Sequence, residues 1–284
     1  MEILKNLLKF IFIAILTICM ISIGMISIVF STIFSKDYIM QKLEETNFYS
    51  GIYELVKSNF ENYIYQSGLD EEVLDDICTE EKIKQDIQIM LSNIYNGTNQ
   101  KIDTTEIANK LNGNIEKLGV KNRQNENAIQ QFVTHICDEY TNTLIHTKYE
   151  NKINEIYKKG TEILNKIYEI ILVVFVIDII AIIIINNKKI SKDIQHIGIA
   201  LLATSIFELS VWQIINLKVD IHGIKIFNDV FSKSVVVIIE NTLGQVASLA
   251  LGTIVIGAIF IIIYAARETY KSLKQKEVSS ERKI

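Results

Sequence analysis

The stretch VFVIDIIAIIII, residues 174–185, places one carboxylate, Asp178, inside a run of large apolar side chains. The length and composition around this run are typical of a membrane-spanning helix. A charged side chain at the centre of a bilayer costs at least ~2.5–3.5 kcal/mol on insertion scales, so it persists only when it is neutralised, paired or used. Asp178 therefore bears on both the fold and the function of the chain.

Apolar residues are concentrated in four segments of this chain, which has 284 residues and is 49% hydrophobic. Each segment is long enough to cross a hydrocarbon core of ~30 Å at about 1.5 Å per helical residue. The sequence contains no proline, so helix breaks have to come from glycine, asparagine and serine. The four predicted transmembrane helices are residues 10–34, 167–186, 194–217 and 242–266.

Basic residues are enriched in three short flanks of these segments, namely residues 1–9, the loop 187–193 and the tail 267–284. Short basic flanks face the cytoplasm, and all three fall on one side of a chain with four spans. We therefore expect a multi-pass protein of a bacterial cell membrane with a cytoplasmic N-terminus and C-terminus. Residues 35–166 and the outer segment 218–241 would then lie outside the cytoplasm.

The first apolar segment has lysines ahead of it, as a secretory signal peptide does. Its apolar run, residues 10–34, is longer than that of a cleaved signal, and no small-residue cleavage site follows it. We interpret this segment as a signal anchor. Cys19 follows Ile18, which stands where a lipoprotein processing site requires a small residue, so we interpret Cys19 as a membrane-core residue.

The region between the first two spans, residues 35–166, has helical periodicity and no extended strand-like alternation. Gly68 and Gly97 supply helix stops, and the last helix is expected to continue into the second span with little or no break. The predicted fold class is all-α: a four-transmembrane-helix membrane protein with an extracytoplasmic α-helical bundle of four or five helices between the first and second spans.

The charge of residues 35–166 is acidic, with 15 Lys and Arg against 22 Asp and Glu, a balance of −7. This balance gives no electrostatic support for binding nucleic acid. Sequence motifs of hydrolases, nucleotide-binding proteins and metalloproteases are absent, so we expect no cofactor, no metal site and no enzyme activity. One helical stripe, interpreted as an exposed polar face, consists of His135, Glu139, His146 and Glu150.

Cys78 and Cys137 are the two cysteines of residues 35–166, in a compartment that permits a disulfide. Closing the loop of about 60 residues between them would stabilise the fold by roughly 4 kcal/mol in the chain-entropy model. The alternative is two buried thiols on apolar helix faces, beside Ile77 and Ile136. Two cysteines alone carry no spacing information, so both alternatives stay open.

Two acids lie inside the predicted spans, Asp178 in the second and Glu208 in the third, at depths that differ by about 4–5 Å. No lysine or arginine lies inside any span, so at least one of the two carboxyls is expected to be protonated. As structural groups they would hydrogen-bond to each other or to serine and threonine, and Thr204 lies one turn before Glu208. The functional alternative is a relay for protons or cations.

Residues 226–240, IFNDVFSKSVVVIIE, are too short and too charged to span a membrane. We expect an amphipathic helix at the outer interface, or packed under the outer bundle, before the chain turns into the fourth span near Asn241. The alternative is an outward extension of the fourth span as one helix of about 40 residues. Within that span, small residues at a spacing of four predict a helix-packing face of Gly244, Ser248 and Gly252.

The layout of a helical bundle between two spans is similar to that of bacterial chemoreceptor sensor regions, although no coiled-coil signalling region follows the second span. Nearly half of the chain would lie outside and the cytoplasmic parts are short. Our leading hypothesis is a non-enzymatic membrane protein in the lipid bilayer whose outer domain binds a protein partner or an envelope component. The alternative is a small transporter or ion-conducting subunit, active as a homo-oligomer, that uses Asp178 and Glu208.

Overall fold

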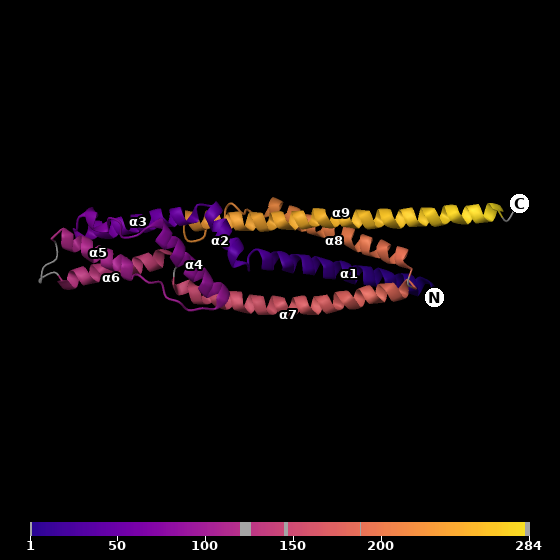
Figure 1. Ribbon diagram of the computed structural model, residues 1–284, viewed down its shortest axis with the longest axis horizontal. Helices are drawn as coiled ribbons and strands as arrows, with labels where there is room; N and C mark the ends of the chain where they lie inside the picture. The colour runs from indigo at the N-terminus through magenta and orange to yellow at the C-terminus, as the bar shows by residue number, and fades with distance from the viewer. Residues whose placement is uncertain (1, 120–125, 145–146, 188, 282–284) are drawn as a thin grey trace. The chain divides into compact units, whose positions relative to one another are not determined.

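The computed structural model describes residues 2–119, 126–144, 147–187 and 189–281 (Figure 1). His146, Lys188 and residues 282–284, which belong to the stripe, loop and tail named above, lie outside the described residues, as does the side chain of Glu150. Within the described ranges the structure consists of nine α-helices and one short 3-10 helix.

The described helices follow in the order α1 Glu2–Ser31, α2 Lys36–Glu45, α3 Phe48–Ser67, η1 Glu71–Leu74, α4 Glu80–Asn96, α5 Thr105–Lys117, α6 Glu126–Leu144, α7 Thr147–Ile185, α8 Ile190–Lys218 and α9 Asp229–Glu281. Four of them, α1, α7, α8 and α9, contain stretches long and apolar enough to cross a membrane, which suggests a multi-pass membrane protein. Helices α2 to α6 lie between the first and second of these (Figure 1). The predicted all-α fold class with its inserted helices is confirmed.

Contacts along the chain divide it into two compact units. The first, which we call the membrane unit, consists of residues 1–32, 162–223 and 239–284. The second, the helical unit, consists of residues 33–161 and 224–238. Two of the boundaries between the units, at residues 161/162 and 238/239, fall inside single helices, α7 and α9. The predicted continuity of the last inserted helix with the second span is therefore confirmed.

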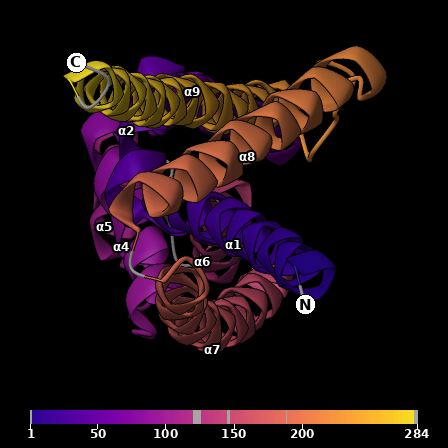
Figure 2. The ribbon, with the colours of Figure 1, turned by 90° about the vertical axis from the view of Figure 1, so that its right-hand side faces the viewer.

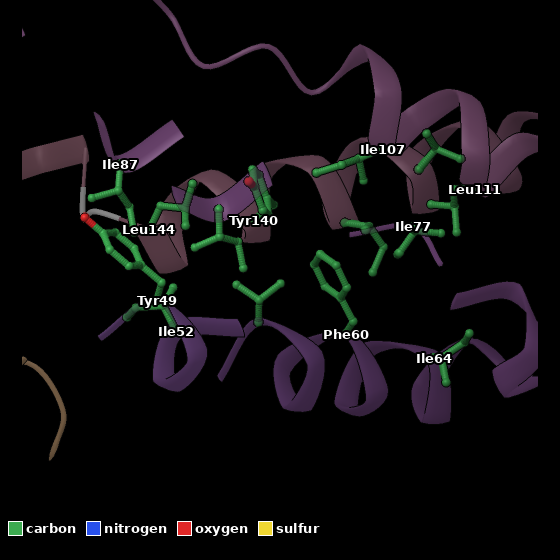
Figure 3. Packing of buried hydrophobic residues seen from close by; sticks show 14 of the residues in the cluster. Tyr49, Ile52, Phe60, Ile64, Ile77, Ile87, Ile107, Leu111, Tyr140 and Leu144 are labelled. Carbon is green, nitrogen blue, oxygen red and sulfur yellow. The ribbon is translucent and has the colours of Figure 1, made fainter. Parts of the chain in front are cut away.

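Helix α3 supplies one face of the core of the helical unit. Its residues Ile52, Val56, Phe60 and Ile64 recur every four positions and are at most 3% exposed. Burying each such side chain contributes about 1.5–3 kcal/mol, as an upper estimate. Figure 3 shows the α3 side chains pointing toward partners from the segment before α4 and from α4, α5 and α6, among them Ile77, Ile87, Ile107, Leu111, Tyr140 and Leu144.

Local signals set where the helices of this unit begin and end. Gly68 and Gly97 follow α3 and α4 with φ of 70° and 66°, a left-handed conformation that glycine adopts without steric cost. At the start of α2 the hydroxyl of Ser35 accepts a hydrogen bond from the N–H of Tyr38, and at the start of α4 Thr79 does the same for Lys82. The two predicted glycine stops are confirmed.

Residues 224–238 pack against α2 and α3 although they are distant in sequence. The ring of Phe231 meets that of Phe48 edge-on at 4.9 Å between centroids. The hydroxyls of Thr46 and Ser234 are 2.8 Å apart and buried. Val230 packs over Gly51, where an added Cβ would lie 2.9 Å from a methyl carbon of Val230. This segment therefore completes the core of the helical unit.

The expectation of a separate amphipathic helix that turns into the fourth span near Asn241 is wrong. Helix α9 runs without interruption for 53 residues from Asp229, which is the alternative of one long helix. It begins where Asn228 Oδ1 accepts a hydrogen bond from the N–H of Phe231 at 3.0 Å. No proline interrupts the chain after this cap, so helical hydrogen bonding continues through residue 241. The packing of its first turns against the helical bundle agrees with the expectation.

In the membrane unit α8 packs along α1 (Figure 2). Leu16 of α1, Ile182 of α7 and Ala200 of α8 form a small buried cluster. Helices α8 and α9 meet where an added Cβ on Gly198 would lie 3.3 Å from the carbonyl oxygen of Gly257. The close approach of these two helices therefore depends on glycines that the sequence analysis did not single out.

The predicted packing face of Gly244, Ser248 and Gly252 does not meet another helix within the described part of this chain. All three residues are exposed, and apart from the helix's own backbone no atom of the described residues lies within 4 Å of a Cβ added at either glycine. Helix α9 buries Val246 and Ala250 instead. Both faces of this helix are apolar or small, so the sequence pattern did not distinguish the face that meets its neighbours.

Candidate functional sites

A groove of about 540 Å³ opens on the helical unit. Its walls come from α3, α6, the first turns of α7 and the chain around the start of α9. A volume of this size is within the range of small-molecule sites. The lining contains apolar and polar residues, and we refer to these two sets as the apolar wall and the polar wall. The lining consists of Leu55, Ile153, Ile226, Phe227, Phe231 and Val235, with Asn59, Glu139, Asn142, Thr143 and Asn228.

Phe227 lies at the edge of the groove in an unusual conformation. Its φ is 55°, in the left-handed region that bulky residues disfavour, and 58% of its surface is exposed. Its ring meets that of Phe231 at 5.6 Å between centroids. The backbone beside it is held because the N–H of Ile226 donates to Ser232 Oγ at 2.8 Å. Such backbone strain, about 1–3 kcal/mol, is concentrated at functional sites in proteins.

Glu139 is the only charged residue among the described residues that line the groove. The side-chain amide of Asn59 donates to Glu139 Oε1 at 3.0 Å and to Thr143 Oγ1 at 2.9 Å. The hydroxyl of Tyr63 lies 3.5 Å from Glu139 Oε2. These partners are neutral, and within the described residues Glu139 forms no ion pair. Its negative charge is therefore oriented but not compensated by a cation of the described residues.

Glu139 was predicted to lie on an exposed polar face together with His135. The structure leaves His135 exposed but half-buries Glu139 in the groove. The other groove residues were not predicted as a site, because they come from segments up to 180 positions apart, such as Leu55 and Val235. The exposed aromatic residue Phe227, in a segment too short to span a membrane, was the one available signal.

Cys78 and Cys137 are free thiols in the structure, so the disulfide that the sequence left open is not formed. Cys78 Sγ lies 3.7 Å from the carbonyl oxygen of Thr79, and Cys137 Sγ lies 3.9 Å from that of Thr104. Burial raises the pKa of Cys78 to about 11 and also raises that of Cys137. In the described part of the chain, no group of three or more His, Cys, Asp or Glu side chains is arranged to hold a metal ion.

A buried polar network joins α4 to α6 in the core of the helical unit. The hydroxyl of Tyr140 donates to Asp86 Oδ2 at 2.6 Å, and Lys82 Nζ lies 2.7 and 2.9 Å from the two carboxylate oxygens. Tyr140 is fully buried and Asp86 is 1% exposed. Burial, together with the hydrogen bond to Asp86, raises the pKa of Tyr140. This network was not predicted, because Asp86 and Tyr140 are 54 positions apart in the sequence.

Asp178 and Glu208 are both buried in the membrane unit, at 2% and 0% exposure. None of their four carboxylate oxygens has a hydrogen-bond partner among the described residues. The expectation that the two acids would hydrogen-bond to each other or to serine and threonine is therefore not met. Thr204 reaches α1 instead, with its hydroxyl 3.4 Å from the carbonyl oxygen of Thr17.

A hydroxyl lies beside Glu208 but has other partners. Thr253 of α9 lies beside Glu208, but its hydroxyl is 3.0 Å from Ser205 Oγ, to which it donates. On the α1 side, a Cβ added at Gly24 would lie 3.1 Å from Glu208 Oε1. The carboxyl thus fills space next to a glycine, and neither of its oxygens has a hydrogen-bond partner among the described residues.

The buried face of α8 is polar or small, with Gly198, Ala200, Thr204, Ser205 and Glu208 turned inward. Large apolar residues such as Ile206 and Ile214 are exposed on the opposite face. An apolar exposed face with a polar interior is the arrangement expected of a helix in lipid. Comparison of the chain with protein-family models, curated proteins and solved structures finds no match.

Proposed function

We propose that this chain is a non-enzymatic protein of a cell membrane whose helical unit binds a partner molecule or envelope component, as an interaction or sensing module. The observation that carries the proposal is the groove, which combines an apolar wall, an exposed and strained Phe227 and an uncompensated carboxylate on Glu139. These features suit recognition, because they offer burial and one fixed charge to a ligand.

The proposed topology places the helical unit outside the cell and both termini in the cytoplasm. It is supported by the basic flanks 1–9, 187–193 and 267–284 and by a first span that fits a signal anchor. Two exposed tyrosines provide matched test positions, Tyr65 at 89% and Tyr270 at 68% exposure. A membrane-impermeant maleimide should label Tyr65→Cys in intact cells and Tyr270→Cys only after permeabilisation. The reverse pattern would overturn the topology.

Binding at the groove is tested by photo-cross-linking in intact cells. A photoreactive p-benzoyl-phenylalanine replaces Phe227 in one variant and Tyr65, which is exposed outside the groove lining, in the control. We expect discrete adducts from position 227 that are absent from position 65. The proposal would be refuted if both positions gave the same adducts, or if position 227 gave none while the protein is present at its normal level.

A second candidate function is a small oligomeric transporter or a subunit that conducts protons or other ions. The specific observation in its favour is that Asp178 and Glu208 are buried without any hydrogen bond or ion pair among the described residues. Unpaired acids are costly in a membrane interior, and in many membrane proteins they mark ion pathways. Four helices are few for a pathway in one chain, so several copies would be required.

Flux into proteoliposomes tests this second candidate. Acidification or sodium uptake by the wild-type protein should disappear in the double variant Asp178→Asn with Glu208→Gln. Each substitution keeps the shape of the side chain and replaces the ionisable carboxyl group by a neutral amide. Absence of flux in the wild type, or unchanged flux in the double variant, would exclude the transport function.

A further inference from the structure

The geometry of the groove points to a ligand class: a small organic monocation with an apolar body, of which an arylalkyl amine is the simplest example. This inference rests on the proposed function and adds the chemistry of the ligand. It follows from three features of the groove, namely its charge, its apolar wall and its size.

The charge of the groove selects a cation. Glu139 is the one charged group among the described lining residues, and its neighbours Asn59, Thr143 and Tyr63 are neutral. A ligand that covers this half-buried carboxylate removes water from it, which costs free energy unless an opposite charge replaces the water. An ammonium group meets that requirement, whereas an anion would be repelled.

The polar wall is already oriented for such a group. Asn59 uses both hydrogens of its amide, one toward Glu139 and one toward Thr143, so Glu139 is held in a single position. The oxygen of the Asn59 side chain is left as an acceptor, and Asn142 contributes a further amide to the lining. An ammonium group has several N–H donors and is matched by acceptors of this kind.

The apolar wall fits the body of the same ligand. Phe227 and Phe231 present two rings in an edge-on arrangement, and Ile153, Ile226 and Val235 extend the surface. Aromatic rings attract apolar groups and also cations near their faces. A volume of about 540 Å³ suits a small molecule and is too small for a folded domain.

The test measures binding of 2-phenylethylamine to the full-length protein in nanodiscs of zwitterionic lipid by titration calorimetry. Empty nanodiscs provide the subtraction for partitioning into lipid. The matched probes are 2-phenylethanol, a neutral molecule of nearly the same shape, and phenylacetate, an anion. We expect the amine to bind about tenfold or more tightly than the alcohol, a difference of about 1.4 kcal/mol, and phenylacetate not to bind.

Three variants locate the effect. Glu139→Gln should reduce the affinity for the amine about tenfold and leave the affinity for the alcohol unchanged. Asn142→Asp, at an exposed lining position, adds a second negative charge and should tighten amine binding. The control Glu106→Gln lies outside the lining, on a side chain that is 57% exposed, and should change neither affinity.

The outcomes separate this inference from the proposed function. Equal binding of amine and alcohol, or amine binding that is unchanged in both Glu139→Gln and Asn142→Asp, overturns the ligand class. Absence of amine binding while position 227 still forms discrete photo-adducts also overturns the ligand class, but leaves the proposed function in place. Amine binding without any adduct at position 227 in cells supports the groove chemistry and counts against a cellular partner at that edge.

Discussion

The substitution Tyr140→Phe removes a single hydroxyl from the core of the helical unit and leaves the ring in place. That hydroxyl donates to the buried carboxylate of Asp86 at 2.6 Å. A hydrogen bond to a charged group contributes about 1.5–3 kcal/mol, and no cavity is created because the ring remains. Asp86 keeps Lys82 at 2.7 and 2.9 Å, so its charge stays paired. We therefore expect a loss of about 1.5–3 kcal/mol.

Hydrogen exchange of the α6 amides in the full-length protein, followed by mass spectrometry, measures this loss locally. Each 1.4 kcal/mol corresponds to a factor of ten, so exchange through opening of the core should be roughly 10- to 150-fold faster. The matched control is Tyr95→Phe, because the Tyr95 hydroxyl donates at 2.7 Å to a neutral acceptor, the carbonyl oxygen of Ile33. Its expected cost is about 0.5–1.5 kcal/mol. Equal effects of the two substitutions would refute the reasoning.

The same network has a pH signature. Burial and the neighbouring Asp86 raise the pKa of Tyr140 above its usual value near 10. The stability that Tyr140 contributes is therefore fully present below pH 10 and is lost as the pH rises further. Above pH 10 the Tyr140 hydroxyl ionises in the unfolded chain but not in the folded chain. Phenylalanine has no such titration, so the stability difference between wild type and Tyr140→Phe should narrow above pH 10. A constant difference from pH 8 to pH 11 would contradict this account.

Three further predictions concern packing and thiol chemistry. Gly51→Ala should destabilise the helical unit by about 1–3 kcal/mol through overpacking against Val230, and the higher helix propensity of alanine should offset about 1 kcal/mol of this loss. Adding Val230→Ala should relieve the clash. Additive effects of the two substitutions on thermal unfolding would refute the contact. Alkylation of Cys78 should rise with pH until about pH 11, above the usual thiol value near 9, and a midpoint near 9 would show that the thiol is not buried. Gly198→Ala should loosen the contact of α8 with α9, because the added Cβ would lie 3.0 Å from a Cβ on α9. The control Gly252→Ala should not, because nothing lies within 4 Å of its added Cβ. Equal rates of proteolysis of the two variants in detergent would contradict the assignment.

The sequence alone determined the helices, their ends and their continuity, because these properties depend on residues that are close together along the chain. The four apolar helices follow from the length and composition of each segment, and the ends of α3 and α4 follow from Gly68 and Gly97, which adopt positive φ at no steric cost. The unbroken course of α7 likewise follows from helical periodicity without proline. The all-α fold class was predictable because helices are held by local hydrogen bonds and by a repeating apolar face.

The candidate sites were decided by tertiary structure, because they join residues that are far apart along the chain. Asp86 and Tyr140 each look ordinary in the sequence, and only packing of α4 against α6 makes them a buried pair. Glu139 became a groove residue only because residues 224–238 pack against α2 and α3, and that placement depends on the absence of a side chain at Gly51. The inward face of the α9 span could not be predicted either, because a helix that is apolar on all sides has no periodic pattern that marks one face. Contacts with α1 and α8 select the face that is buried.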